Sequence, residues 1–236
     1  MMERFGIQEV YGMHNMPGIP VGAFGIRDGA MMAAADTVDI LITGKGGHAA
    51  KPQDCIDPVV VASHLILALQ TIASRNVDPL HQVVVSICVV ETDSPASNVI
   101  PQTVKLKGTV RTMDPAVQDL AEQRLTEIAQ GTALALGARA EVSYKRGYPV
   151  TVNATTQTGY AVDVARAISP QVDTNIAPMM GAEDFSYMLN ARPGAYIFVG
   201  NGDTAMVHHP AYNFDDNVIP FGASWYAGMV EARMPV

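Results

Sequence analysis

Three of the six histidines stand in loops rich in glycine and proline, where an imidazole is available for metal binding or acid–base chemistry. His14 lies in GMHNMPG, His48 in GGHAAKP and His208 in VHHPAY. Neutral imidazole at the end of a strand is a good ligand for zinc or a similar borderline metal, because the rigid strand fixes the ring. Taken singly, each histidine is more often a structural or surface residue. Their chemistry therefore has to be judged from the elements and motifs around them.

The most regular sequence pattern lies in the central stretch, residues 37–148, which contains His48. Alternating or β-branched runs predict four strands, and Asp57-Pro58 and Asp114-Pro115 predict two helix starts, because Asp is a favoured N-cap and Pro suits the first helical turn. Gly137 is placed to end the second helix. The predicted strands are residues 37–43, 83–90, 104–112 and 140–148, and the predicted buried stripes are Val61, Leu65, Leu69 and Ile72, then Ala121, Leu125, Ile128 and Ala135. This βαββαβ order predicts a ferredoxin-like domain with two helices on one face of an antiparallel sheet.

The flanks, residues 1–36 and 149–236, are less regular. They contain short strand candidates at 10–13 and 31–35, a helix at 157–168, a buried strand at 195–199 and a last helix at 218–233. Neither flank makes a domain by itself. We expect one α/β domain with a partial mixed sheet, interrupted by the ferredoxin-like insert and missing its amino-terminal portion.

Composition excludes several classes of partner. The net charge is −8 with Lys and Arg scattered, which disfavours nucleic acid and anionic membrane surfaces. No apolar run approaches the roughly 20 residues that span a bilayer, and MMERFGIQEV has no signal-peptide core. The two cysteines, Cys55 and Cys88, form neither a disulfide framework nor a CxxC metal motif. These features predict a cytoplasmic globular protein.

Six motifs occur in one order along nearly the whole chain: GMHNMPGIPVG, DILITGKGGHAAKPQDCIDPV, NVIPQTVKLKGTVRTMDP, YKRGYPVTVN, MMGAEDFSYM and VHHPAYNFDDN. The series resembles the dinuclear-metal amidohydrolase and metallopeptidase family that contains hippurate hydrolase, bacterial aminoacylases and auxin-conjugate hydrolases. The resemblance implies hydrolysis of N-acyl amino acids by a water molecule activated by two divalent metals, with Zn, Mn, Co or Ni as the expected ions. It also implies that residues 37–148 are a lid and dimerisation domain, and that residues 1–36 and 149–236 belong to the metal-dependent catalytic domain.

The resemblance assigns a role to five residues. His14 and His208 resemble metal ligands, and His48 resembles a lid histidine that stabilises the oxyanion in the partner subunit of a homodimer. Asn98 in NVIP and Arg111 in GTVRT resemble lid residues that hold the substrate carboxylate, for which a guanidinium is well suited. The GAEDF segment with Glu183 and Asp184 is expected to line the site without a catalytic role.

The family draws further ligands from a Cys-x-His motif and a Glu-Glu pair, whose first glutamate is the general base. Neither motif occurs in these 236 residues. The hydrolase activity of this chain is therefore expected to be impaired, with metal absent or weakly bound. Two alternatives stay open: the chain is a non-catalytic dimerising or binding module, or a separate chain supplies the missing motifs.

Overall fold

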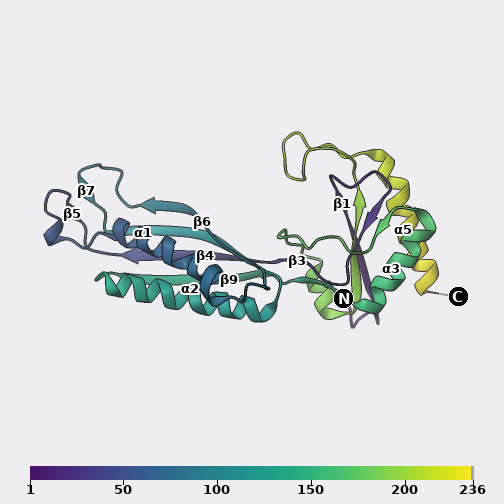
Figure 1. The fold of residues 1–236 in the computed structure, drawn as a ribbon, viewed down its shortest axis with the longest axis horizontal. Coiled ribbons are helices and arrows are strands. Elements are labelled where there is room, and N and C mark those ends of the chain that lie inside the picture. The colour runs from purple at the N-terminus through teal and green to yellow at the C-terminus, as the bar shows by residue number, and fades with distance from the viewer. Residues whose placement is uncertain (235–236) are drawn as a thin grey trace. The chain divides into compact units, whose positions relative to one another are not determined.

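The computed structural model describes residues 1–234 and contains two compact units (Figure 1). One unit is continuous in sequence, residues 34–150, and the other combines residues 1–33 with the chain from 151 onward. The sequence placed the boundaries of the insert at 37 and 148. We call these parts the continuous unit and the composite unit.

The continuous unit has the element order βαββαβ, and its four long strands form one sheet in which all neighbours are antiparallel, in the order β6-β8-β4-β9. Figure 1 shows α1 and α2 lying side by side along this sheet. The long elements are β4 (Ala34–Thr43), α1 (Pro58–Leu69), β6 (Val83–Thr92), β8 (Thr103–Thr112), α2 (Pro115–Ala135) and β9 (Arg139–Tyr148). Shorter ones are β5 (Gly47–His48), η1 (Pro52–Asp54), η2 (Ile72–Asn76) and β7 (Val99–Ile100), with β5 paired to β7.

The core of this unit follows from the alternation of β4. Val38, Ile40 and Ile42 are buried and face the helices, whereas Leu41 between them is 39% exposed. Both helices start as the dipeptides predict, because Asp57 accepts a hydrogen bond from the Val59 amide (2.9 Å) and Asp114 from the Ala116 amide (2.7 Å).

The buried stripe of α2 differs from the prediction at its end. Ala135 is exposed, and the stripe continues with a spacing of four residues, through Ala121, Leu125, Ala129 and Ala133. Gly137 ends the helix as predicted, with a φ of 79°. The Ala138 amide donates to Ala133 O and the Gly137 amide to Leu134 O, which is the Schellman arrangement. Ala135 therefore lies outside the buried stripe of α2.

The expectation that no apolar stretch reaches membrane-spanning length needs a correction. Residues Pro58–Asn76 form one helical stretch of 19 residues with a mean hydropathy of 1.3, enough to span by length and composition alone. One stripe of it, Val61, Leu65, Leu69 and Ile72, is at most 1% exposed in the core beneath the helices, whereas Val60 is 50% and Leu67 72% exposed. Core packing therefore accounts for only part of this composition, since 33% of the stretch is buried.

The composite unit is built around a mixed sheet in the order β1-β12-β2-β11. β1 and β12 are parallel, β12 and β2 antiparallel, and β2 and β11 parallel, while β3 and β10 form a separate antiparallel pair. Its elements are β1 (Val10–Met16), β2 (Phe24–Gly25), β3 (Gly29–Met32), β10 (Thr151–Asn153), α3 (Thr155–Ile168), β11 (Val172–Asp173), α4 (Ser186–Ala191), β12 (Gly194–Gly200), η3 (Asp216–Val218) and α5 (Ile219–Arg233). The strand predicted at 31–35 is divided between β3 and β4.

The central strand β12 separates two apolar clusters. All seven of its residues are buried, as expected for a strand covered on both faces. Ala195, Ile197 and Val199 pack with residues of α3 and α5, including Trp225. Tyr196 and Phe198 point to the opposite face, where they pack with Met16 and with Phe185 beside α4. A residue of β1 therefore packs with one cluster or the other, depending on the face of the sheet to which its side chain points.

Candidate functional site

His14 lies near the carboxyl end of β1, two residues before the strand ends at Met16. Because β1 and β12 are parallel, with His14 opposite Phe198, their carboxyl ends meet at one edge of the sheet. The His14 ring places Nδ1 2.5 Å from the Asn15 carbonyl oxygen. A hydrogen bond there fixes the ring and leaves Nε2 as the nitrogen available to a ligand.

The face of β1 that carries His14 also carries Gly12, because side chains alternate along a strand. A Cβ on Gly12 would lie 2.8 Å from the Tyr196 ring and 3.1 Å from the Phe185 ring. The glycine therefore leaves the space in which these two aromatic rings pack, with their centroids 5.4 Å apart. Tyr196 is thus fixed on the same face as His14.

Glu183 is the acidic residue that this arrangement holds. Its carboxylate accepts hydrogen bonds from the Tyr196 hydroxyl (2.5 Å) and the Phe185 amide (3.2 Å). Burial raises the pKa of Glu183. The hydrogen bonds with Tyr196 and Phe185, a third with the Asp184 side chain, and the charge of His14 outweigh burial and bring the pKa below its ordinary value. Glu183 is thus a carboxylate whose hydrogen bonds favour its ionised form. No local pattern in the sequence predicts the contact between Tyr196 and Glu183.

The loop after β12 carries His208 and is tied to the same edge of the sheet. Asn201, only 2% exposed, donates to the Asn213 carbonyl (2.8 Å) and accepts from the Asp215 amide (3.0 Å). The Tyr212 hydroxyl donates to Asn15 Oδ1 (2.6 Å), beside His14. No local sequence pattern predicts this link, because the two residues are 197 positions apart.

His208 itself is exposed and has a φ of 67°, in the left-handed region that few non-glycine residues adopt. Its neighbour His209 is engaged locally, because its Nδ1 accepts a hydrogen bond from the Ala211 amide (3.0 Å). The loop thus holds His208 in an uncommon backbone conformation. Such strain is typical of functional loops.

The described residues, 1–234, contain no group of three or more His, Cys, Asp or Glu side chains placed to hold a metal ion. A catalytic zinc usually has three protein ligands. The available donors, an oriented His14 and an exposed His208, do not by themselves fit a complete metal site. No catalytic step through a metal follows from these residues alone.

His48 and Asn98 lie together at one end of the continuous unit. His48 pairs with Val99 across β5 and β7, and the Ala49 amide donates to the Asn98 carbonyl (3.0 Å). Both side chains are exposed. The His48 Nδ1 accepts from the Ala50 amide (3.1 Å), which leaves its Nε2 available.

Arg111 lies at the other end of the same sheet. It pairs with Ala35 at the start of β4, whereas Thr103 of the same strand pairs with Thr43 at its end. Eight residues of extended chain separate these pairs, about 26 Å at the rise of a strand. His48 and Asn98 lie beyond the Thr43 end. Within one chain, therefore, Asn98 and Arg111 lie at opposite ends of the sheet, and their expected shared role in holding a carboxylate stays a prediction.

A cavity of about 580 Å³ opens elsewhere in the composite unit. It lies between residues 5–9 and α5, and Glu9, Tyr11 and Arg233 contribute to its wall. None of the five predicted site residues lines it. The cavity is therefore separate from the candidate metal ligands His14 and His208.

Comparison with known proteins gives one consistent result. Residues 1–232 match the sequence profile described as "Peptidase family M20/M25/M40". The chain is 40% identical over 214 residues to an N-acetyl-L-cysteine deacetylase of Bacillus subtilis, covering 91% of this chain and 51% of the deacetylase. It is 35% identical over 229 residues to hippurate hydrolase of Campylobacter jejuni, covering 96% of this chain and 60% of that enzyme.

A solved structure agrees with these sequence relatives. The crystal structure of a dinuclear metal binding peptidase of the M20 family from Bacillus subtilis superposes with a TM-score of 0.79 at 29% identity, covering 97% of this chain and 58% of that one. The chain thus spans between 51% and 60% of the length of these relatives.

Proposed function

We propose that this chain, which belongs to peptidase family M20/M25/M40, forms part of an amidohydrolase that cleaves N-acyl amino acids. Membership places it among metal-dependent amidohydrolases and peptidases. The substrate class rests on two relatives named for N-acetyl-L-cysteine and hippurate, both N-acylated amino acids. The composite unit would supply the catalytic part, and the continuous unit would be a ferredoxin-like lid.

The observation that carries this proposal is the edge of the composite sheet where β1 and β12 end. It presents a His14 ring fixed through Nδ1, and the loop with His208 is tethered there through Tyr212 and Asn15. Imidazoles on elements that meet at one edge are suited to ligate one metal cluster. We therefore propose His14 and His208 as two ligands of a dinuclear site whose remaining ligands lie outside these 236 residues.

The separation within the continuous unit supports a homodimer. His48 and Asn98 at one end and Arg111 at the other cannot reach one small substrate within a single lid. A second copy of the chain would bring its own His48 end to the site, where the imidazole stabilises the oxyanion and Arg111 binds the carboxylate. β6 and β9 are the edge strands of this sheet, and an exposed edge is able to pair with another chain.

The function is tested by measuring metal content and hydrolysis of N-acetyl-L-cysteine and hippurate. We expect the 236-residue chain alone to bind Zn²⁺ or Mn²⁺ weakly and to hydrolyse both at the background rate, since loss of a general base alone removes about 10²–10⁴-fold of rate. A chimera that adds the unmatched part of the Bacillus subtilis deacetylase should gain chelator-sensitive activity, and His14→Ala should abolish it.

The same experiment decides the alternative function. The lack of a three-ligand group within residues 1–234 favours a non-catalytic dimerising or binding module. A chimera that folds, dimerises and still hydrolyses nothing would support that module. Robust chelator-sensitive turnover by the 236 residues alone would show that the ligands have been assigned to the wrong residues.

A further inference from the structure

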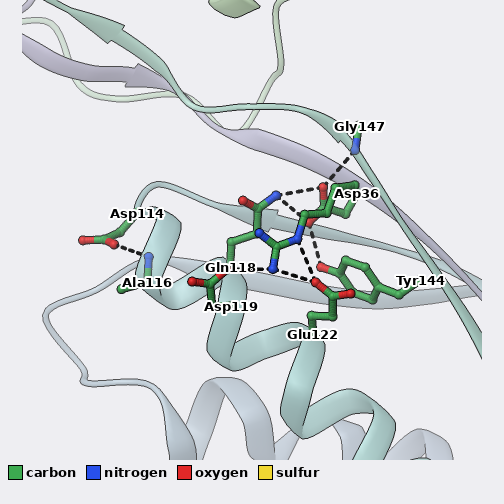
Figure 2. Close-up of polar contacts among 9 residues, drawn as sticks. Asp36, Asp114, Ala116, Gln118, Asp119, Glu122, Tyr144 and Gly147 are labelled. Atoms are coloured by element: carbon green, nitrogen blue, oxygen red, sulfur yellow. Dashed lines mark hydrogen bonds and ion pairs between the residues drawn. The ribbon is translucent and has the colours of Figure 1, made fainter. Parts of the chain in front are cut away.

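Asp36 is an aspartate buried in the continuous unit, with 1% of its surface exposed. Figure 2 shows its carboxylate surrounded by groups from α2 and β9. Gln118 Nε2 donates to both oxygens (3.0 and 2.8 Å), the Tyr144 hydroxyl to Oδ2 (2.7 Å) and the Gly147 amide to Oδ1 (3.1 Å). All of these donors are neutral. They tie one residue of β4 to two other elements.

Because its hydrogen-bond donors are neutral, the burial of the Asp36 carboxylate is unfavourable in its ionised form. Burying an ionised group is unfavourable unless an opposite charge or hydrogen bonds compensate it. Within the described residues Asp36 forms no ion pair, and Arg146, its partner across the β4–β9 pairing, pairs with Asp119 and Glu122 instead. The donors therefore have to compensate the charge alone, and the carboxylate must be held in one geometry to keep all of them.

The position that this network fixes is an irregular one. The pairing of β4 with β9 shifts its register between Ala35 and Asp36. A Cβ on Gly147 would lie 2.2 Å from the Ala35 carbonyl oxygen, so the close approach of the strands requires glycine there. The chain enters this unit at Ala34 and leaves it at Val150, both within three residues of the network. Asp36 therefore fastens the sheet where regular pairing is interrupted.

The backbone carbonyl of Asp36 interacts with side chains on the opposite face of the sheet. Val110 is buried beside Asp36, so Thr109 and Arg111 alternate to the face that the helices leave open. The Asp36 carbonyl accepts hydrogen bonds from Thr109 Oγ1 (2.8 Å) and Arg111 Nη1 (3.4 Å). Arg111 Nη1 also donates to Thr109 Oγ1 and to the Val110 carbonyl. One nitrogen of the guanidinium thus takes part in every hydrogen bond that the structure describes for this side chain.

The structure assigns Asp36 as a positioning residue for Arg111. Its carboxylate fixes the β4 backbone from the helix-covered face, and its carbonyl oxygen then holds Arg111 Nη1 on the open face. The Nε and Nη2 edge of the guanidinium stays available for a planar anion, which suits bidentate binding of a carboxylate. The carboxylate-binding step rests on the proposed function, whereas the positioning step does not.

The positioning step is tested by NMR on the 15N-labelled 236-residue chain without any ligand. We compare wild type, Asp36→Ala and the milder Tyr144→Phe, and follow the Arg111 Nε–Hε signal, assigned by its loss in Arg111→Lys. The control is Leu65→Ala, which destabilises the same core through a cavity but leaves the network intact. Asp36→Ala should shift and broaden the Arg111 signal, Tyr144→Phe should shift it less, and Leu65→Ala should leave it in place.

The carboxylate step uses hippurate as the probe and N-methylbenzamide, which lacks the carboxylate, as the matched control compound. We expect hippurate to perturb the Arg111 signal and its affinity to fall about fivefold to tenfold in Asp36→Ala, as for the loss of one hydrogen-bond contribution. N-methylbenzamide should cause no such change in any variant.

The two steps fail in different ways. An unchanged Arg111 signal in a folded Asp36→Ala chain overturns the positioning role. If Asp36→Ala does not fold, the same unchanged signal in Tyr144→Phe overturns it. A signal that responds to Asp36→Ala but not to hippurate supports positioning and rejects the proposed carboxylate site. Equal shifts in Leu65→Ala and Asp36→Ala would show a general effect of stability and refute the specific link.

Discussion

The continuous and composite units differ in how far apart in sequence their stabilising contacts lie. In the continuous unit, four strands and two helices enclose one core, and the Asp36 network joins residues of a single unbroken stretch. In the composite unit, Tyr212 is bonded to Asn15 and Arg233 to Glu9, across 197 and 224 positions. The unit with the proposed metal ligands therefore depends on contacts between two distant segments. It has a larger loop-closure entropy to overcome unless the intervening unit is folded.

The largest effect that would test this difference is the removal of each unit from the other. We expect residues 34–150 expressed alone to fold cooperatively, because their core and sheet are complete within this segment. Residues 151–236 alone should remain unfolded, since they lack β1 and β2 of the mixed sheet. Circular dichroism melts and the dispersion of amide NMR signals measure both outcomes.

A joined chain without the continuous unit sharpens that result. Linking residues 1–33 to 151–236 through a short Gly-Ser segment restores all four strands of the mixed sheet, so some folding should return. If residues 34–150 alone proved unfolded while the joined chain folded, the comparison would be reversed.

The second test concerns the carboxylates, which the units hold by different means. Asp36 has neutral donors, whereas Glu9 is held by Arg233 through two hydrogen bonds of 3.0 and 3.1 Å, with Gln157 and Tyr11 also donating. The Arg233 hydrogen bonds are the main reason that the pKa of Glu9 falls to about 2, although burial opposes them. This pair joins the start of β1 to the end of α5, so it closes the composite unit.

The depressed pKa sets the direction of the pH dependence. Because Glu9 has a lower pKa folded than unfolded, its stabilisation is complete above about pH 4.5 and is lost as the pH falls towards 2. We expect Glu9→Gln to lower the free energy of unfolding by about 2 kcal/mol at pH 7 and by much less at pH 3. Urea denaturation at the two pH values measures the difference.

Glu3→Gln is the control for that prediction. Glu3 also pairs with an arginine, Arg192, but its side chain is 89% exposed, and exposed pairs contribute little. Equal effects of the two substitutions at both pH values would mean that the Glu9 pair does not close the unit.

The same contrast explains what the sequence predicted. In the continuous unit, the strands, both helix starts and the Gly137 cap follow from local patterns. The end of the buried stripe of α2, at Ala135, and the apolar length of Pro58–Asn76 were predicted wrongly. In the composite unit, the motif order indicated His14 and His208, but the hydrogen bonds from Tyr196 to Glu183 and from Tyr212 to Asn15 join residues that no local period relates. The burial of Asp36 could not be predicted either, because an aspartate in an alternating strand is ordinarily exposed.

The smallest expected effect concerns helix capping. Asp57 and Asp114 cap the two long helices of the continuous unit, whereas Ala154, the N-cap of α3 in the composite unit, provides no side-chain hydrogen bond. Asp114→Ala should therefore destabilise the continuous unit by about 1 kcal/mol. Ala154→Ser should stabilise the composite unit by about 0.5–1 kcal/mol, because the Ala154 backbone already has the extended conformation of an N-cap (φ −77°, ψ 132°).

Hydrogen exchange resolved by residue measures each effect in its own unit. Asp114→Ala should speed exchange of the slowest amides in α2 and β8 and leave those of β12 unchanged, while Ala154→Ser should slow those of α3 and β12 only. The composite unit depends on the continuous unit to bring its two segments together. Strong destabilisation of the continuous unit should therefore speed hydrogen exchange in the composite unit, but not the reverse. Adding Leu65→Ala to Asp114→Ala should begin to speed exchange in β12, whereas no substitution confined to α3 should speed it in β8. Protection that changed equally in both directions would mean that the two units unfold as one.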